Sequence, residues 1–217
     1  MEEIDDLILY TAPMSAYCTK VRMAAHLKGL TLVERFPPEG YGSAAYRRIV
    51  PMGTIPALVH GGNVLTESDA IVEYLDDIGA GQPLMPSDPM VRARNREISR
   101  YADNRLELAA RALYPKIGIG KDDPALNEAL IRNVAALEKI VTPGPFLTGS
   151  LPSLADCALV PVCNVLAVME LYLPLPLPWP VWFAPYRAAV RDLPGVALLL
   201  DEQAAALDAW ARARMTS

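Results

Sequence analysis

The first part of the chain alternates short apolar runs with one amphipathic stretch. Residues 7–11 (Leu-Ile-Leu-Tyr-Thr) suit a buried strand, and residues 30–35 predict a second one. Between them, helical spacing of apolar positions begins after Ser15 and closes at Lys28 and Gly29, a cation and a glycine typical of a helix C-terminus. This order predicts a right-handed βαβ unit with parallel strands.

The next segment predicts a hairpin followed by a helix. After an irregular stretch with helical tendency at 41–50, residues 57–65 form two apolar runs around the turn pair Gly61-Gly62. Residues 66–69 (Thr-Glu-Ser-Asp) resemble a capped helix start, and apolar positions at helical spacing follow them. The whole N-terminal part therefore has the order βαβ–ββα.

The pattern changes after a stretch rich in glycine and proline at 79–86, which predicts a domain boundary. We expect an α/β domain over 1–82 and an all-α domain over 87–217. Residues 173–180 carry proline at every second position and predict an extended segment, either a cover over a pocket or a surface loop. Helical periodicity predicts helices over 90–114, 124–141, 154–172, 183–192 and 196–213.

Composition and charge argue against several classes of function. The formal net charge is −5, which disfavours binding to nucleic acid or to an anionic membrane. The most apolar stretch, 160–178, is interrupted by a glutamate and several prolines, and the acidic N-terminus is unlike a secretion signal. Three cysteines and two histidines offer neither a disulfide framework nor a metal-ligand spacing, so we expect a reduced, cytoplasmic protein without a metal.

Four strings, in order, resemble the soluble glutathione transferases. Residues 15–22 (Ser-Ala-Tyr-Cys-Thr-Lys-Val-Arg) are similar to the opening Ser-Pro-Tyr-Cys-x-Lys-Val-Arg of that family. Residues 50–58 resemble its Asn-Pro-x-Gly-x-[Val/Ile]-Pro-x-Leu string, and 65–75 resemble its Glu-Ser-x-Ala-Ile-x-x-Tyr-Leu glutathione motif. Residues 153–156 (Ser-Leu-Ala-Asp) resemble the cap of its buried sixth helix. The resemblance spans residues 7–212.

The resemblance implies a thioredoxin-like domain followed by a helical domain that contributes the electrophile pocket. It implies glutathione as co-substrate, conjugation of the glutathione thiolate to a small hydrophobic electrophile, and a homodimer. Two alternatives stay open: a glutathione-dependent isomerase, reductase or ether-cleaving enzyme, and a non-catalytic glutathione-binding protein. The stretch 153–164 is somewhat like the zeta class, which isomerises maleyl compounds, but the Ser-Ser-Cys string of that class is absent.

Ser15 is the catalytic residue that the resemblance implies. A serine hydroxyl at a helix N-terminus would donate a charge-assisted hydrogen bond to the glutathione sulfur and favour the thiolate. The ordinary alternative is a helix N-cap. Cys18 occupies the resolving position of a glutaredoxin-like motif whose first cysteine is here Ser15, so dithiol chemistry is excluded and a packing role is favoured. Tyr17 and Tyr10 are weaker candidates, because some classes use a tyrosine hydroxyl.

The remaining glutathione contacts are also carried over by resemblance. Ile55 and Pro56 correspond to a cis-proline pair that turns backbone groups toward the cysteinyl part of glutathione. Glu67 and Ser68 correspond to the residues that hold the γ-glutamyl ammonium and carboxylate. Asp103 is a weaker candidate, either reaching the partner subunit's glutathione or acting as a solvated charge on a helix face. The cation for the glycyl carboxylate is left open among Lys20, Arg47 and Arg48.

Two further assignments concern structure and specificity. Ser153 and Asp156 are assigned to a reciprocal cap that matters for folding and not for chemistry. The electrophile pocket is expected between the domains, with a lining that includes Pro13, Met14, Leu113, Tyr114 and Ile117.

Overall fold

The computed structural model describes residues 6–118 and 123–216, and its N-terminal part is built on a four-stranded mixed sheet. The strand order is β2-β1-β3-β4, with β1 parallel to β2 and antiparallel to β3. The strands are β1 (Leu7–Tyr10), β2 (Leu32–Arg35), β3 (Ala57–His60) and β4 (Asn63–Leu65), joined with helices α1 (Ala16–Leu27), α2 (Ala44–Arg47) and α3 (Ser68–Ile78). The predicted βαβ unit and hairpin are both confirmed.

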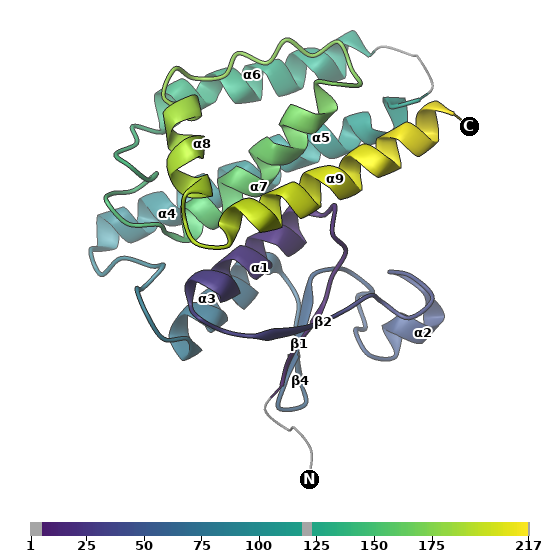
Figure 1. Ribbon diagram of the computed structural model, residues 1–217, viewed down its shortest axis with the longest axis vertical. Helices are drawn as coiled ribbons and strands as arrows, with labels where there is room; N and C mark the ends of the chain where they lie inside the picture. The colour runs from purple at the N-terminus through teal and green to yellow at the C-terminus, as the bar shows by residue number, and fades with distance from the viewer. Residues whose placement is uncertain (1–5, 119–122, 217) are drawn as a thin grey trace.

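Helix α1 separates the sheet from the helical domain (Figure 1). The C-terminal end of α1 forms as the sequence predicts: Gly29 adopts φ +67°, and the Leu30 N–H reaches back to the Ala25 carbonyl. Lys28 is buried and pairs with Asp76 of α3 at 2.8 Å, so it joins two helices as well as facing the end of its own. The apolar face of α1 is thereby fixed against α3 on one side and the helical domain on the other.

The helical domain gathers on one side of the sheet (Figure 1). The predicted helix over 90–114 is not uniform, because a wider π-helical segment, η1, interrupts it between α4 and α5. The elements are α4 (Pro89–Tyr101), η1 (Ala102–Glu107), α5 (Leu108–Leu113), the 3-10 turn η2 (Tyr114–Lys116), α6 (Pro124–Ile140), α7 (Leu154–Met169), α8 (Phe183–Arg191) and α9 (Val196–Met215).

Helix α7 is the centre of the helical domain, and nearly all its residues are buried. The predicted cap is present: Asp156 Oδ2 accepts from the Ser153 N–H at 2.8 Å. Its other oxygen accepts from the Leu147 N–H and the Tyr186 hydroxyl, both at 3.0 Å. Burial raises the pKa of Asp156, and these donors offset the cost of placing its carboxyl in the core.

The proline-rich segment 173–180 is a strap packed on the helical domain, not a cover over a pocket. Its leucines turn inward and the alternating prolines at 174, 176 and 178 turn outward. The Leu175 and Leu177 N–H groups each donate to the carbonyl of the leucine two residues earlier. These bonds satisfy leucine backbone groups in a segment where the alternating prolines have no N–H to donate. Glu170 at the end of α7 anchors the strap by accepting from the Trp179 indole N–H at 2.9 Å.

We predict that Asp156→Ala lowers the free energy of unfolding by about 3 kcal/mol, because four buried donors lose their acceptor: the N–H and hydroxyl of Ser153, the Leu147 N–H and the Tyr186 hydroxyl. Urea denaturation monitored by circular dichroism measures the change. Asp77→Ala, at an exposed position on α3, is the matched control and should alter stability by less than about 0.5 kcal/mol. Equal losses in the two variants would show that the cap adds nothing to stability.

Candidate active site

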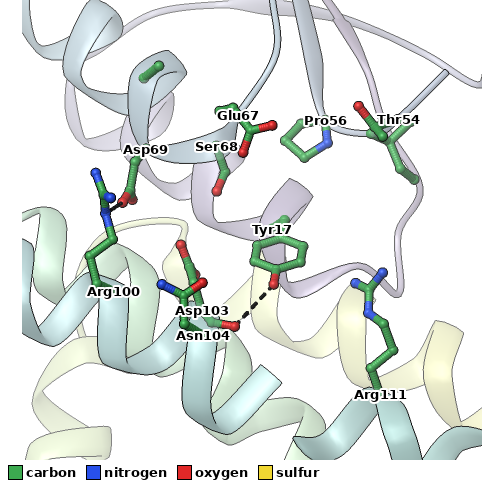
Figure 2. A pocket seen from close by; sticks show the side chains of 12 residues that line it. Tyr17, Thr54, Pro56, Glu67, Ser68, Asp69, Arg100, Asp103, Asn104 and Arg111 are labelled. Atoms are coloured by element: carbon green, nitrogen blue, oxygen red, sulfur yellow. Dashed lines mark hydrogen bonds and ion pairs between the residues drawn. The ribbon is translucent and has the colours of Figure 1, made fainter. Parts of the chain in front are cut away.

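A cavity of about 430 Å³ lies where the sheet domain meets α4 and η1. Figure 2 shows its two walls facing each other, with Pro56, Glu67 and Ser68 on one side and Asp103 and Asn104 on the other. Tyr17 of α1 closes one side, and its hydroxyl donates to the Asp103 backbone carbonyl at 3.2 Å. This first cavity therefore brings together six predicted site residues: Tyr17, Ile55, Pro56, Glu67, Ser68 and Asp103.

The start of α3 presents free backbone donors to the first cavity. Glu67 precedes the helix with φ +67°, a left-handed conformation that costs a non-glycine residue on the order of 1 kcal/mol or more. No side chain caps α3, so the ordinary interpretation of residues 66–69 as a capped start is wrong. Without a side-chain cap, the first-turn N–H groups and the dipole of α3 are available to an anionic group.

The Ile55–Pro56 peptide, which lines the same cavity, is cis, as the resemblance implies.

Lys20 is the buried cation beneath this helix start. Its ammonium donates to Ser68 Oγ at 3.3 Å and pairs with Asp69 of α3 at 2.5 Å and Asp103 of η1 at 2.7 Å. Burial acts to raise the pKa of Asp69, but Lys20, Ser99 and Arg100 together outweigh it and hold that pKa below its usual value. For Asp103, burial prevails and raises the pKa. Because Ser68 Oγ accepts from Lys20, its own proton is directed to another acceptor.

A second cavity, of about 370 Å³, adjoins the first and contains Ser15. Thr54, Ile55 and Arg111 line both cavities. Ser15 caps α1, since its Oγ accepts from the Cys18 N–H at 3.3 Å, so the capping role holds alongside any catalytic one. The remaining wall is mainly apolar and aromatic, with Met14, Tyr41, Tyr114 and Trp210 among its residues.

Several predicted residues lie elsewhere. Cys18 is fully buried away from both cavities, and burial raises the pKa of its thiol. Tyr10 is buried against the Tyr46 ring on the α2 side of the sheet. Of the five expected electrophile-pocket residues, Met14 and Tyr114 line the second cavity. Leu113 and Ile117 do not, because they are buried in the core, and Pro13 points to solvent.

The charged candidates also need correction. Asp103 is not a solvated charge, since its side chain is 13% exposed and faces the cavity of its own chain. Lys20 lies under Ser68 and lines neither cavity, since its ammonium is taken up by Ser68, Asp69 and Asp103. The Arg47 guanidinium donates to the Gly42, Pro51 and Met52 carbonyls, which holds it to its own loop. Burial raises the pKa of Tyr17 well above its ordinary range, so its phenol stays neutral.

Sequence reasoning missed residues that the helical domain contributes. Arg100, Asn104, Glu107, Arg111 and Trp210 line one or both cavities. For Arg100, Glu107 and Arg111 the signal in the sequence is a set of charges on a helical stretch, which usually marks a solvated face. Among the described residues, no cluster of three or more metal-binding side chains is present.

Comparisons with known proteins decide the family. The model of the glutathione S-transferase N-terminal domain matches residues 9–83, and that of the C-terminal domain matches residues 108–213. The chain belongs to the glutathione S-transferase family. Like the glutathione transferases it resembles, it is an enzyme of that class, with the helical C-terminal domain placed beside a thioredoxin-like sheet. None of its described helices is long and apolar enough to cross a bilayer.

Relatives within the glutathione transferases include zeta-class members. The chain is 34% identical to glutathione S-transferase Z2 of Arabidopsis thaliana over 71% of this chain and 74% of that protein. It is 30% identical to a probable maleylacetoacetate isomerase 2 of Drosophila melanogaster over 71% of each. Among solved structures, a delta-class glutathione transferase of Nilaparvata lugens superposes with a TM-score of 0.82 at 25% identity, over 96% of this chain and 99% of that one.

We predict that Lys20→Met lowers the free energy of unfolding by about 3–5 kcal/mol, because two carboxylates lose their buried cation. Adding Asp69→Asn should recover part of the loss, as a double-mutant cycle in urea would measure. The exposed Lys139→Met is the matched control.

The same variant has a defined pH dependence. In the parent, the stability contributed by Asp69 is present above its unfolded pKa and is lost as pH falls through its lowered folded pKa. Without Lys20 the buried carboxylate takes up a proton more readily. The stability deficit of Lys20→Met relative to the parent should therefore shrink as the pH falls from about 7 to about 4. A deficit that is constant over this range would contradict a buried ion cluster.

Proposed function

We propose that this enzyme conjugates the thiolate of glutathione to small hydrophobic electrophiles, with Ser15 as the residue that activates the sulfur. The observation that carries the proposal is the shared wall of Thr54 and Ile55. On one side of it lie Glu67 and Ser68, and on the other lies Ser15 in an apolar cavity. A tripeptide bound along Ile55 would reach from the first cavity to Ser15.

The first cavity matches the charges of the γ-glutamyl end. Its carboxylate would accept from Ser68 and from the first N–H groups of α3, while its ammonium would meet Glu67. Lys20 supports this assignment because it directs the Ser68 proton outward. The Ile55 backbone would pair with the cysteinyl backbone.

Ser15 would then favour the thiolate over the thiol. Its Oγ accepts from the Cys18 N–H, so its own O–H donates to the sulfur, next to the N-terminus of α1. The sulfur forms a bond to an electrophilic carbon in the second cavity, and the displaced bonding pair departs with the leaving group or moves onto the electrophile. The thiol proton goes to solvent.

A glutathione-dependent isomerase is the second candidate, because relatives include a probable maleylacetoacetate isomerase. Isomerisation would use the same thiolate, adding to a double bond and leaving again. Disulfide reduction by a dithiol is disfavoured, since Cys18 is buried and Ser15 replaces the nucleophile. The presence of Ser15, the Ile55–Pro56 pair and the Glu67–Ser68 pair argues against complete loss of the glutathione site.

Assembly and compartment complete the proposal. We expect a cytoplasmic homodimer, consistent with three free, buried cysteines among the described residues. Light scattering at working concentration should give twice the chain mass of 23.6 kDa. A mass of one chain would contradict the dimer while leaving the chemistry intact.

The first experiment is a calorimetric titration with glutathione beside conjugation of chlorodinitrobenzene and an assay with a maleyl substrate. Binding with conjugation supports the transferase. Isomerisation without conjugation supports the second candidate. No heat of binding at millimolar glutathione would overturn the site assignment.

Two serine variants separate activation from binding. We predict that Ser15→Ala lowers kcat by about 10–100-fold, the value of one charge-assisted hydrogen bond, and moves the rising limb of the pH profile to higher pH. Its glutathione Kd should change little. Ser68→Ala should instead weaken Kd while leaving the pH profile in place. If both variants lost affinity alone, Ser15 would be a binding residue and not the activator.

A further inference from the structure

Glu107 holds one of the few buried side-chain atoms that lack a hydrogen-bond partner. Among the described residues these atoms are Thr11 Oγ1, Trp182 Nε1 and Glu107 Oε2, and of the three residues Glu107 is the one in the wall of the second cavity. Its side chain is 1% exposed, and burial raises its pKa although Arg111 opposes this. A half-satisfied buried carboxylate does not favour folding, so stability does not account for it.

The partner of Glu107 is Arg111, one helical turn later. Its Nη2 donates to Glu107 Oε1 at 3.0 Å, while more than half of the Arg111 side chain stays exposed. The guanidinium also lies over the Tyr17 ring, 5.3 Å from its centroid. The Glu107 carboxylate and the face of the Tyr17 ring therefore hold the guanidinium in place. Its remaining N–H groups can donate to a ligand.

Arg111 lies at the junction of the two cavities. It lines both, together with Thr54 and Ile55. Figure 2 shows its side chain reaching from the helical domain toward the loop that carries Thr54, beside Tyr17. On the proposed function, this junction is where the glutathione sulfur meets the electrophile. Apart from the Glu107–Arg111 pair, the residues of the second cavity are uncharged.

We propose that Arg111 is a catalytic residue that binds the carbonyl oxygen of α,β-unsaturated carbonyl electrophiles and stabilises the negative charge reaching that oxygen when the thiolate adds. Glu107 is then a positioning residue for Arg111. The inference rests on the proposed function and names its substrate class: aryl enones, whose ring suits the aromatic wall of Tyr41, Tyr114 and Trp210.

The chemistry balances without a further reagent. The sulfur lone pair forms a bond to the β-carbon, the C=C π pair moves toward the carbonyl, and the carbonyl π pair becomes an oxyanion. Arg111 donates hydrogen bonds to that oxyanion, more strongly than to the neutral ketone, which lowers the barrier. The α-carbon of the enolate then takes a proton from water, which gives the saturated ketone thioether.

Substrate choice provides the test. Benzylideneacetone retains negative charge on its own oxygen during attack, whereas nitrobenzyl chloride passes the charge to departing chloride. Removing one oxyanion donor lowers kcat by about 100-fold, so Arg111→Met should lose about that factor with the enone and less than about threefold with the halide. The glutathione Kd from calorimetry should stay within about threefold.

Companion variants separate position from charge. Arg111→Lys keeps the charge without the planar fork and should recover only part of the enone rate. Glu107→Gln should lower kcat for the enone, by less than Arg111→Met, with the glutathione Kd unchanged. Arg105→Met, at an exposed arginine six residues earlier, is the matched control and should behave as the parent does.

The outcomes are distinct. Three results with Arg111→Met would each overturn the inference while the proposed function stands: equal losses with both substrates, glutathione binding weakened tenfold or more, or an unchanged enone rate. A parent enzyme that accepts the halide but not the enone would do the same. A parent enzyme that turns over neither substrate would overturn the proposed function, and this inference with it.

Discussion

The ammonium group of Lys20 joins the two domains beneath the candidate glutathione site. It comes from α1 and pairs with Asp69 of α3 and Asp103 of η1, which belong to different domains. Asp69 in turn accepts from Ser99 at 2.7 Å and Arg100 at 3.0 Å, both on α4. Taking three charges out of water is costly, and it is tolerated only where the geometry satisfies each of them. What the cluster provides is a fixed position. It holds Ser68 and the start of α3 in place relative to the η1 wall of the first cavity, which a mobile domain contact would not do.

The sequence predicted what depends on neighbouring residues. Short-range patterns indicate the order of strands and helices, the helix end at Gly29 and the Ser153–Asp156 cap, and the structure has all three. These signals involve residues within one or two turns of each other, so no tertiary information was needed. The site roles of Ser15, Glu67 and Ser68 came from the family resemblance instead, since the local pattern alone indicates only helix starts. The structure has Ser15 in the wall of the second cavity and Glu67 and Ser68 in the wall of the first.

The misplaced residues depend on helical phase and on contacts between distant segments. The π segment η1 has a wider turn than an α-helix, so residues after it are rotated relative to a continuous helix. This rotation separates α5 from the phase of α4, with Glu107 and Arg111 at the second cavity while Leu113 lies in the core. Lys20 was one of three cations left open for the glycyl carboxylate, and its place in the buried cluster was not predicted, since its carboxylate partners are 49 and 83 positions away. Nothing within a local window distinguishes such a lysine from a solvated one.

The two cavities differ in how their walls are held, and this difference bears on what each can bind. Side chains of the first cavity are held in place by Lys20, which binds Ser68 and Asp69, and by the hydrogen bond from Tyr17 to the Asp103 carbonyl. Such a fixed wall suits one ligand with a matching pattern of charges. The second cavity takes its walls from loops of the sheet domain and from η1, α5, η2 and the end of α9, with aromatic rings that accept many shapes. Apolar contact discriminates poorly between electrophiles of similar size, because one methylene changes binding by only about 1–3 kcal/mol. Selectivity in such a cavity therefore depends on its few charged groups, and Glu107 and Arg111 are the charged residues that line the second cavity.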